Sequence, residues 1–192
     1  MKILLRNIAF LFMLVSLSSC GYNNMVGLDE EVQGAWAQVE NAYQRRADLI
    51  PNLVNTVKGV ANFEKETLTG VIEARAKATS VNIDASNLTA ENIKQFESAQ
   101  KGLSGSLSRL LVAVERYPEL KANKNFLELQ AQLEGTENRI SVERQKFNDT
   151  VRGFNTFVRS FPQVIYSGIM GFGKKAYFEG TEGTEQAPEV EF

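Results

Sequence analysis

Few residues in this chain could do acid–base or metal chemistry. Its 192 residues include no histidine, the commonest general base and neutral metal ligand, and only one cysteine. One cysteine excludes an internal disulfide framework and a zinc site built from cysteines. Carboxylates stand close together in Glu64/Glu66 and Glu134/Glu137, but only residues three or four apart share a helix face. With no histidine, free thiol or nucleophile motif in support, we predict no catalytic residues, no metal site, no cofactor and no enzyme activity.

The single cysteine, Cys20, ends a segment typical of an export signal. Two basic residues precede an apolar run over residues 8–17, which is too short to span a bilayer stably. The run ends in Leu17-Ser18-Ser19-Cys20, which resembles the bacterial lipobox. That resemblance implies cleavage before Cys20, a diacylglycerol on its thiol and acylation, for example by palmitate, of the new amine. An ordinary signal peptide with an incidental cysteine is the alternative.

Removal of residues 1–19 would leave a mildly acidic chain anchored to a membrane. Lys2 and Arg6 would be lost, so the remaining 19 basic and 23 acidic residues give a formal charge of −4. That balance predicts no nucleic-acid partner. Two or three acyl chains, at about 0.8 kcal/mol per buried methylene, hold a protein firmly. We expect a periplasm-facing or outer-membrane location. Gly21 stands where enterobacterial lipoproteins retained in the inner membrane carry aspartate, which favours the outer membrane and leaves the inner one open.

Beyond an expected tether over residues 20–27, apolar residues recur in steps of three and four from Leu28. The pattern passes through Pro51 without losing phase and continues through Leu68 and Val71. It therefore predicts either one long helix kinked at Pro51 or two helices divided there. A polar stretch over residues 79–88 predicts a loop. The expected core positions of this first part are Val32, Trp36, Val39, Tyr43, Ile50, Leu53, Val57 and Val60.

Two further helices follow. One begins near Thr89 and is closed by Pro118, and the next begins near Ala122, is capped by Asn123 or Asn125, and ends before Pro162. Residues 126–161 carry an aromatic or aliphatic residue every seventh position, which favours coiled-coil-like packing. The core positions expected here are Ile93, Phe96, Leu103, Leu107, Leu110, Val114, Tyr117, Phe126, Leu133, Ile140, Phe147, Phe154 and Phe161.

These helices predict an all-α fold, an antiparallel up-and-down bundle of long helices over residues 28–162. The apolar, glycine-rich segment 163–178 is expected to pack on the end of the bundle or on the membrane surface. The acidic tail 179–192 is expected to be disordered.

Polar residues interrupt the apolar seams and form the candidate site. Arg46, Gln100, Glu137 and Arg144 fall at seam positions, where an unpaired charge is costly. We expect a buried layer that fixes helix register, with Arg46 within salt-bridge reach of Glu137. The alternative is a polar pocket for an anionic ligand, a partner peptide or an envelope polymer. The adjoining Arg45 and Asp48, beside Pro51, would either join an anionic site or stabilise the expected kink.

Several stretches of this chain resemble the LemA family of bacterial envelope proteins. The resemblance covers residues 22–178 and implies a helical-bundle envelope protein with no established enzymatic activity. Phe147 and Phe63 stand where the family more often has tyrosine and histidine, which argues against a catalytic role at either place. The stretches that carry the resemblance include residues 35–40 (AWAQVE), 44–54 (QRRADLIPNLV), 57–59 (VKG), 73–76 (EARA), 117–123 (YPELKAN) and 133–140 (LEGTENRI), with Phe126, Asn148, Asn155, Phe161, Pro162 and the region around Gly171.

Together these features predict a lipid-anchored protein of the bacterial envelope that acts as a non-enzymatic interaction or scaffold module. Its expected partners are the membrane and other envelope proteins. A binding protein for an envelope polymer or anionic ligand is the alternative, and a concave pocket opening onto Arg46, Gln100 and Glu137 would favour it.

Overall fold

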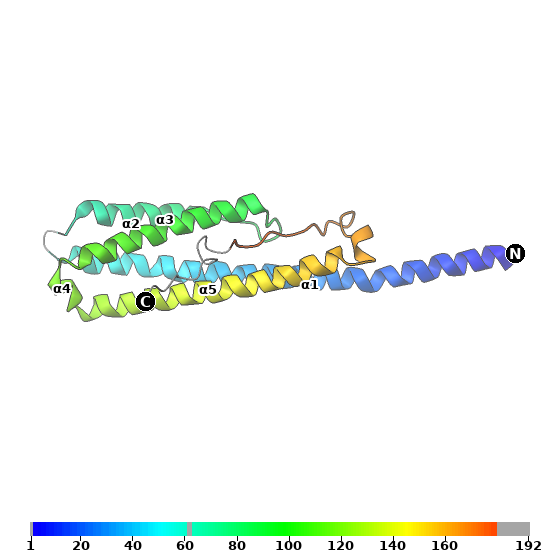
Figure 1. Cartoon of the computed structure of the whole chain (residues 1–192), viewed down its shortest axis with the longest axis horizontal. Helices are drawn as coiled ribbons and strands as arrows, with labels where there is room; N and C mark the ends of the chain where they lie inside the picture. The colour runs from blue at the N-terminus through cyan, green and yellow to red at the C-terminus, as the bar shows by residue number, and fades with distance from the viewer. Residues whose placement is uncertain (1, 61–62, 180–192) are drawn as a thin grey trace, which may run out of the picture.

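The computed structural model describes residues 2–60 and 63–179, with side chains described from Gly21 onward. Within this part of the chain the fold is an all-α bundle of long antiparallel helices, as predicted. Figure 1 shows α1 beside α5 and α2 beside α3, with the short α4 at the turn that leads into α5. The elements are α1 (Lys2–Lys58), α2 (Lys65–Ser80), α3 (Ala90–Val114), α4 (Pro118–Lys121), α5 (Lys124–Arg159) and a 3-10 turn, η1 (Gln163–Ile165).

Helix α1 begins much earlier than the expected start at Leu28. It runs without interruption from Lys2, so residues 21–27, expected as a tether, are helical, and Met25 is fully buried. Met25 stands seven residues before Val32 and therefore extends the same seam by one heptad. Seven helical residues rise about 10 Å, so this stretch is less than half as long as an extended tether. Cys20 lies in this helix, and its side chain is outside the described residues.

The division of the first helical run lies at Gly59 and not at Pro51. Pro51 is exposed inside α1, which continues to Lys58, and α2 starts only at Lys65. The expectation that one helix continues through Leu68 and Val71 is therefore wrong. Glycine is among the weakest helix formers, so a break at Gly59 is favourable. The break lets α2 fold back, and Leu68 and Val71 are buried on that helix.

The next two long helices start where they were expected, near Thr89 and after the predicted cap Asn123, although α3 ends at Val114 and Pro118 begins α4. The Thr89 side chain accepts the backbone N–H of Asn92 at 3.2 Å, and Asn123 accepts that of Phe126 at 3.2 Å. Each bond satisfies one donor that a helix start leaves unpaired. The heptad positions of α5 are buried from Phe126 to Phe154, but Phe161 is 81% exposed. The inclusion of Phe161 in the core was wrong because α5 ends at Arg159, before the next heptad is complete.

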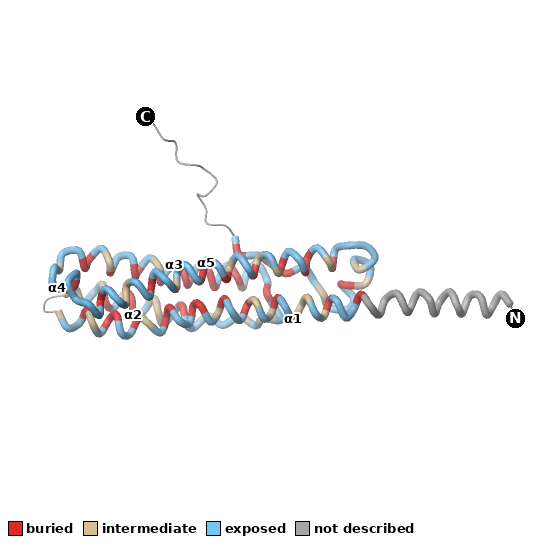
Figure 2. The backbone as a smooth tube through the Cα atoms, turned by 90° about the horizontal axis from the view of Figure 1, so that it is seen from below, coloured by how far each residue is buried: buried red, intermediate tan, exposed pale blue. Residues whose placement is uncertain are grey.

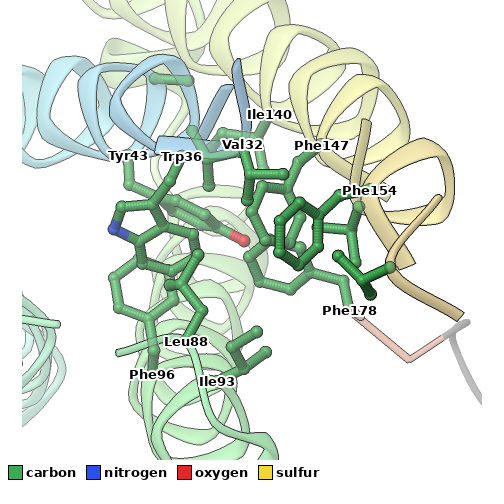
Figure 3. Packing of buried hydrophobic residues seen from close by; sticks show 14 of the residues in the cluster. Val32, Trp36, Tyr43, Leu88, Ile93, Phe96, Ile140, Phe147, Phe154 and Phe178 are labelled. Atoms are coloured by element: carbon green, nitrogen blue, oxygen red, sulfur yellow. The ribbon is translucent and has the colours of Figure 1, made fainter. Parts of the chain in front are cut away.

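The buried side chains fall into two clusters along the bundle, drawn as red stretches of the tube in Figure 2. The distal cluster, toward α4, is mainly aliphatic and includes Ile50, Leu110 and Leu133. The proximal cluster, toward the N-terminal end of α1, surrounds the chain's single tryptophan, Trp36. Figure 3 shows aromatic side chains from three helices and the C-terminal segment meeting there.

The proximal cluster is closed by non-helical chain. The loop after α2 contributes the buried Leu88, and the C-terminal segment contributes Phe178, which is 3% exposed. These two pieces are joined where the backbone N–H of Ala176 donates to the carbonyl of Leu88 at 3.3 Å. The segment expected to pack on the bundle thus reaches into its core. The predicted disordered tail falls, apart from Glu179, outside the described residues.

Candidate functional site

Arg46 lies between the two clusters and is 2% exposed. Its Nη1 donates to Glu137 Oε2 at 2.7 Å and to the Ser104 hydroxyl at 2.8 Å, and its Nη2 donates to Gln100 Oε1 at 2.7 Å. The predicted ion pair between Arg46 and Glu137 is therefore present. The guanidinium also lies 5.0 Å from the centre of the Tyr43 ring, a cation–π distance. These contacts offset part of the cost of burying the charge, while the Arg46 Nε is buried without a hydrogen-bond partner.

This polar layer connects all four long helices. Arg46 comes from α1, Gln100 and Ser104 from α3, and Glu137 from α5. The Gln100 amide then donates to the carbonyl of Ala78 on α2 at 3.3 Å. Because both Nη atoms of Arg46 bond to groups on other helices, a helix shifted by one turn would leave a buried charge unpaired. The arrangement can therefore fix the register of the bundle.

A second ion pair lies one helical turn from Gln100 along α3 and two turns from Glu137 along α5. Arg144 is bonded to Glu97, which is 7% exposed, and its guanidinium stacks 4.6 Å from the centre of the Phe178 ring. Burial raises the pKa of the Glu97 carboxyl, and the charge of Arg144 opposes that rise only in part. Burial also raises the pKa of the Tyr43 hydroxyl, against the effect of both arginines. The two ion pairs thus belong to one electrostatic region without direct contact.

The structure does not bring Arg45 and Asp48 into the polar layer. Both side chains are exposed, and Asp48 accepts a hydrogen bond from Gln44 on its own helix at 2.8 Å. Arg45 and Asp48 stand one and two residues away from Arg46, and side chains at such spacings on a helix point in different directions. In the described part of the chain, the side chains of these three residues therefore do not converge on one anion-binding site.

Pro51 leaves one carbonyl of α1 without its helical partner, and another helix supplies the missing donor. Proline has no N–H, so the carbonyl four residues earlier, that of Ala47, loses its bond. The Arg75 Nε of α2 donates to this oxygen at 2.7 Å. The role that the sequence suggested for the neighbouring arginines thus belongs to Arg75, and the bond joins α1 to α2.

Two asparagines of α5 hold the C-terminal segment by its backbone. The Asn155 side chain, 2% exposed, donates to the carbonyl of Lys175 at 2.8 Å and accepts its N–H at 2.9 Å. The Asn148 side chain makes the same two bonds with Phe178, at 3.0 and 2.9 Å. The Lys175 ammonium reaches Asp29 of α1 at 2.6 Å. We call this arrangement the asparagine clamp.

The cavities around the polar layer touch some of its members but not Arg46. The largest, about 840 Å³, is an open crevice between the loop after α2 and the C-terminal segment, lined among others by Asn87, Thr89 and Lys174. Smaller ones of about 270 and 490 Å³ touch Gln100 and Glu137 separately, and neither includes Arg46. The described residues contain no group of acidic or sulfur ligands that could hold a metal ion. The helices with described side chains likewise include none that is long and apolar enough to cross a membrane.

A family model for the LemA family matches residues 35–192. The chain belongs to the LemA family. It is 26% identical over 145 residues to the Protein LemA of Metamycoplasma hominis, an alignment that covers 76% of this chain and 59% of that relative. It is also 24% identical over 176 residues to the magnetosome protein MamQ of Magnetospirillum gryphiswaldense, covering 82% of this chain and 64% of the relative. The chain thus spans about three-fifths of the length of these curated relatives.

In this LemA-family chain, the apolar periodicity of the sequence predicted the polar layer but not the asparagine clamp. Arg46, Gln100 and Glu137 stand out because each replaces an apolar residue in a regular pattern. Asn148 and Asn155 share a seven-residue spacing, and both stand among the residues that carry the resemblance to the LemA family. Neither signal says that they bind a non-helical segment of the same chain, because that segment takes part through its backbone atoms.

Proposed function

We propose that this LemA-family chain is a lipoprotein, anchored through Cys20 to a membrane of the bacterial envelope, and that its bundle acts as a non-enzymatic scaffold. Membership of the LemA family supports association with the envelope, and it gives no indication of an enzymatic activity. The apolar run that ends at Cys20 supports the anchor. The geometry that favours a scaffold over a ligand-binding protein is the closed polar layer around Arg46.

A ligand site would need a charged group that a ligand can reach, and Arg46 is 2% exposed with both of its Nη atoms bonded inside the protein. Glu137, the exposed member of the layer, already uses one oxygen on Arg46. A ligand would therefore have to break existing bonds before it gained new ones. This argues against the anionic-ligand or envelope-polymer alternative.

The anchor is tested by replacing the cysteine, Cys20→Ser, in the full chain expressed in a bacterium. We expect the native chain to resist extraction from membranes by high salt, with a mass that shows loss of residues 1–19 and gain of acyl groups. The variant should keep an unprocessed signal and lack the acyl mass. A native chain that carries an unmodified Cys20 would refute the anchor.

The scaffold role is tested by in-cell crosslinking of the native chain, followed by identification of the partners. We expect defined envelope proteins to be recovered, and to be lost when the anchor is removed by Cys20→Ser. If no protein partner is recovered while the purified chain binds a glycan, and Arg46→Met abolishes that binding without unfolding the bundle, the polymer-binding alternative replaces the scaffold.

A further inference from the structure

The loop after α5 exposes large apolar side chains that a protein in water normally covers. Ile169 is 88% exposed, Phe161 81% and Ile165 65%, all within one short stretch. Such a concentrated apolar surface marks a contact site. We call this surface the proximal rim, and its members are Phe161, Val164, Ile165, Ile169 and Met170.

The proximal rim is fixed at one level of α1, next to the residue that carries the proposed lipid. Gly21 of α1 is buried against Tyr166 so closely that a Cβ there would lie 2.3 Å from the tyrosine hydroxyl. The ring of Tyr22 packs edge-on against Phe172, with centroids 5.7 Å apart. Figure 1 shows the loop beside α1 where that helix leaves the bundle. The rim therefore lies level with Cys20.

The charge of this region suits an anionic surface. Residues 150–178 contain four basic and no acidic residues, although the whole chain is net negative. Two of the four are paired with acidic residues outside this stretch, Arg152 with Asp149 and Lys175 with Asp29. Arg159 and Lys174 are both exposed in this stretch. Basic residues beside exposed apolar ones are typical of segments that bind the headgroup region of anionic bilayers. Tyr22, 44% exposed, adds an aromatic residue of the kind that prefers this interface.

We propose that the proximal rim is a lipid-contact surface that inserts its apolar side chains into the leaflet holding the acyl chains on Cys20. The inference rests on the proposed anchor. With both contacts made, the bundle is held to the leaflet at two places, so it cannot swing freely about a single attachment point. A protein docked on the rim is the competing occupant, and the experiment below separates the two.

The test uses the full lipidated chain in vesicles of phosphatidylcholine with one-third phosphatidylglycerol. Ile169→Cys is labelled with an environment-sensitive fluorophore, while acylated Cys20 does not react. The control is Leu127→Cys, another exposed apolar position (49%) at the opposite end of α5, about 48 Å from Arg159 along the helix. We expect spin-labelled lipids to quench the label at residue 169 several-fold more than the label at residue 127.

Equal quenching at the two positions would overturn the lipid-contact proposal. Flotation of the same vesicles distinguishes this failure from failure of the anchor. If the chain floats with the vesicles and the label at residue 169 stays in water, the anchor stands and the rim must serve a protein partner. If Cys20 is unmodified and the chain does not float, both proposals fall. The emission of Trp36 checks that each variant is folded.

Discussion

Phe178 offers the sharpest test of how the C-terminal segment contributes to the fold. Its side chain is 3% exposed, stacks on Trp36 with ring centroids 5.7 Å apart, and meets Phe147 at 5.3 Å. The Arg144 guanidinium lies 4.6 Å from the centre of the Phe178 ring. Replacing a buried phenylalanine by alanine costs about 3–5 kcal/mol. Because this non-helical segment can relax, we expect Phe178→Ala to cost about 3 kcal/mol, the lower limit.

The matched control is Tyr177→Ala, the neighbouring aromatic on the same non-helical segment. Tyr177 is 37% exposed, so this change should cost less than about 1 kcal/mol. Urea unfolding, followed by Trp36 fluorescence and by far-UV circular dichroism, gives both values. Amide exchange at Phe178, whose N–H donates to Asn148 at 2.9 Å, should accelerate in Phe178→Ala. A loss no larger than that of Tyr177→Ala would show that the segment does not close the core in solution.

Three further predictions concern buried polar groups. Glu137→Ala should cost about 3–5 kcal/mol because it leaves the buried charge of Arg46 without its counter-charge, whereas Arg46→Ala, which leaves an exposed carboxylate and the buried Gln100 amide oxygen unpaired, should cost about 1–3 kcal/mol. Arg75→Ala should cost about 1.5–3 kcal/mol in the native chain and clearly less in a Pro51→Ala background, where the restored N–H can bond the freed carbonyl. The raised pKa of Glu97 means that the folded state holds its proton above the unfolded pKa, so stability falls as pH rises through that window. Urea unfolding at several pH values should show this slope in the native chain and a smaller one in Glu97→Gln.

Each of these predictions has a result that would contradict it. A loss in Glu137→Ala smaller than that in Arg46→Ala would mean that the charge of Arg46 is open to water. An Arg75 loss unchanged by Pro51→Ala would mean that the freed carbonyl is not what Arg75 stabilises. If the stability difference between the native chain and Glu97→Gln is constant or rises with pH, burial does not control the Glu97 carboxyl.

The sequence predicted those features that depend on periodicity and on local capping. Trp36, Phe96 and Phe147 are buried because they continue regular seams, and Asn123 caps α5 because its side chain reaches the N–H group three residues on. These effects act within a few residues along one helix. The resemblance to the LemA family, drawn from short stretches, is confirmed by the family match.

Features that depend on distant parts of the chain were missed or misplaced. The helix continues through Pro51, as one of the two predicted alternatives had it, with Arg75 of α2 bonding the freed carbonyl, but the break at Gly59 was not predicted. Phe178 lies in a segment without helical period, and its burial depends on Asn148. No rule based on spacing within one element reports such contacts, because both partners lie far apart in sequence.

The unbroken course of α1 has a consequence for distance. From Gly21 to Lys58 the helix contains 38 residues, which at 1.5 Å per residue span about 57 Å. A bundle standing upright on a lipid at Cys20 would hold the turn around α4 at that height above the leaflet, because no flexible joint interrupts the helix. The molecule is then a rod of set length, and lengthening or shortening α1 by whole heptads, with matched changes in α5, would move its tip by about 10 Å at a time.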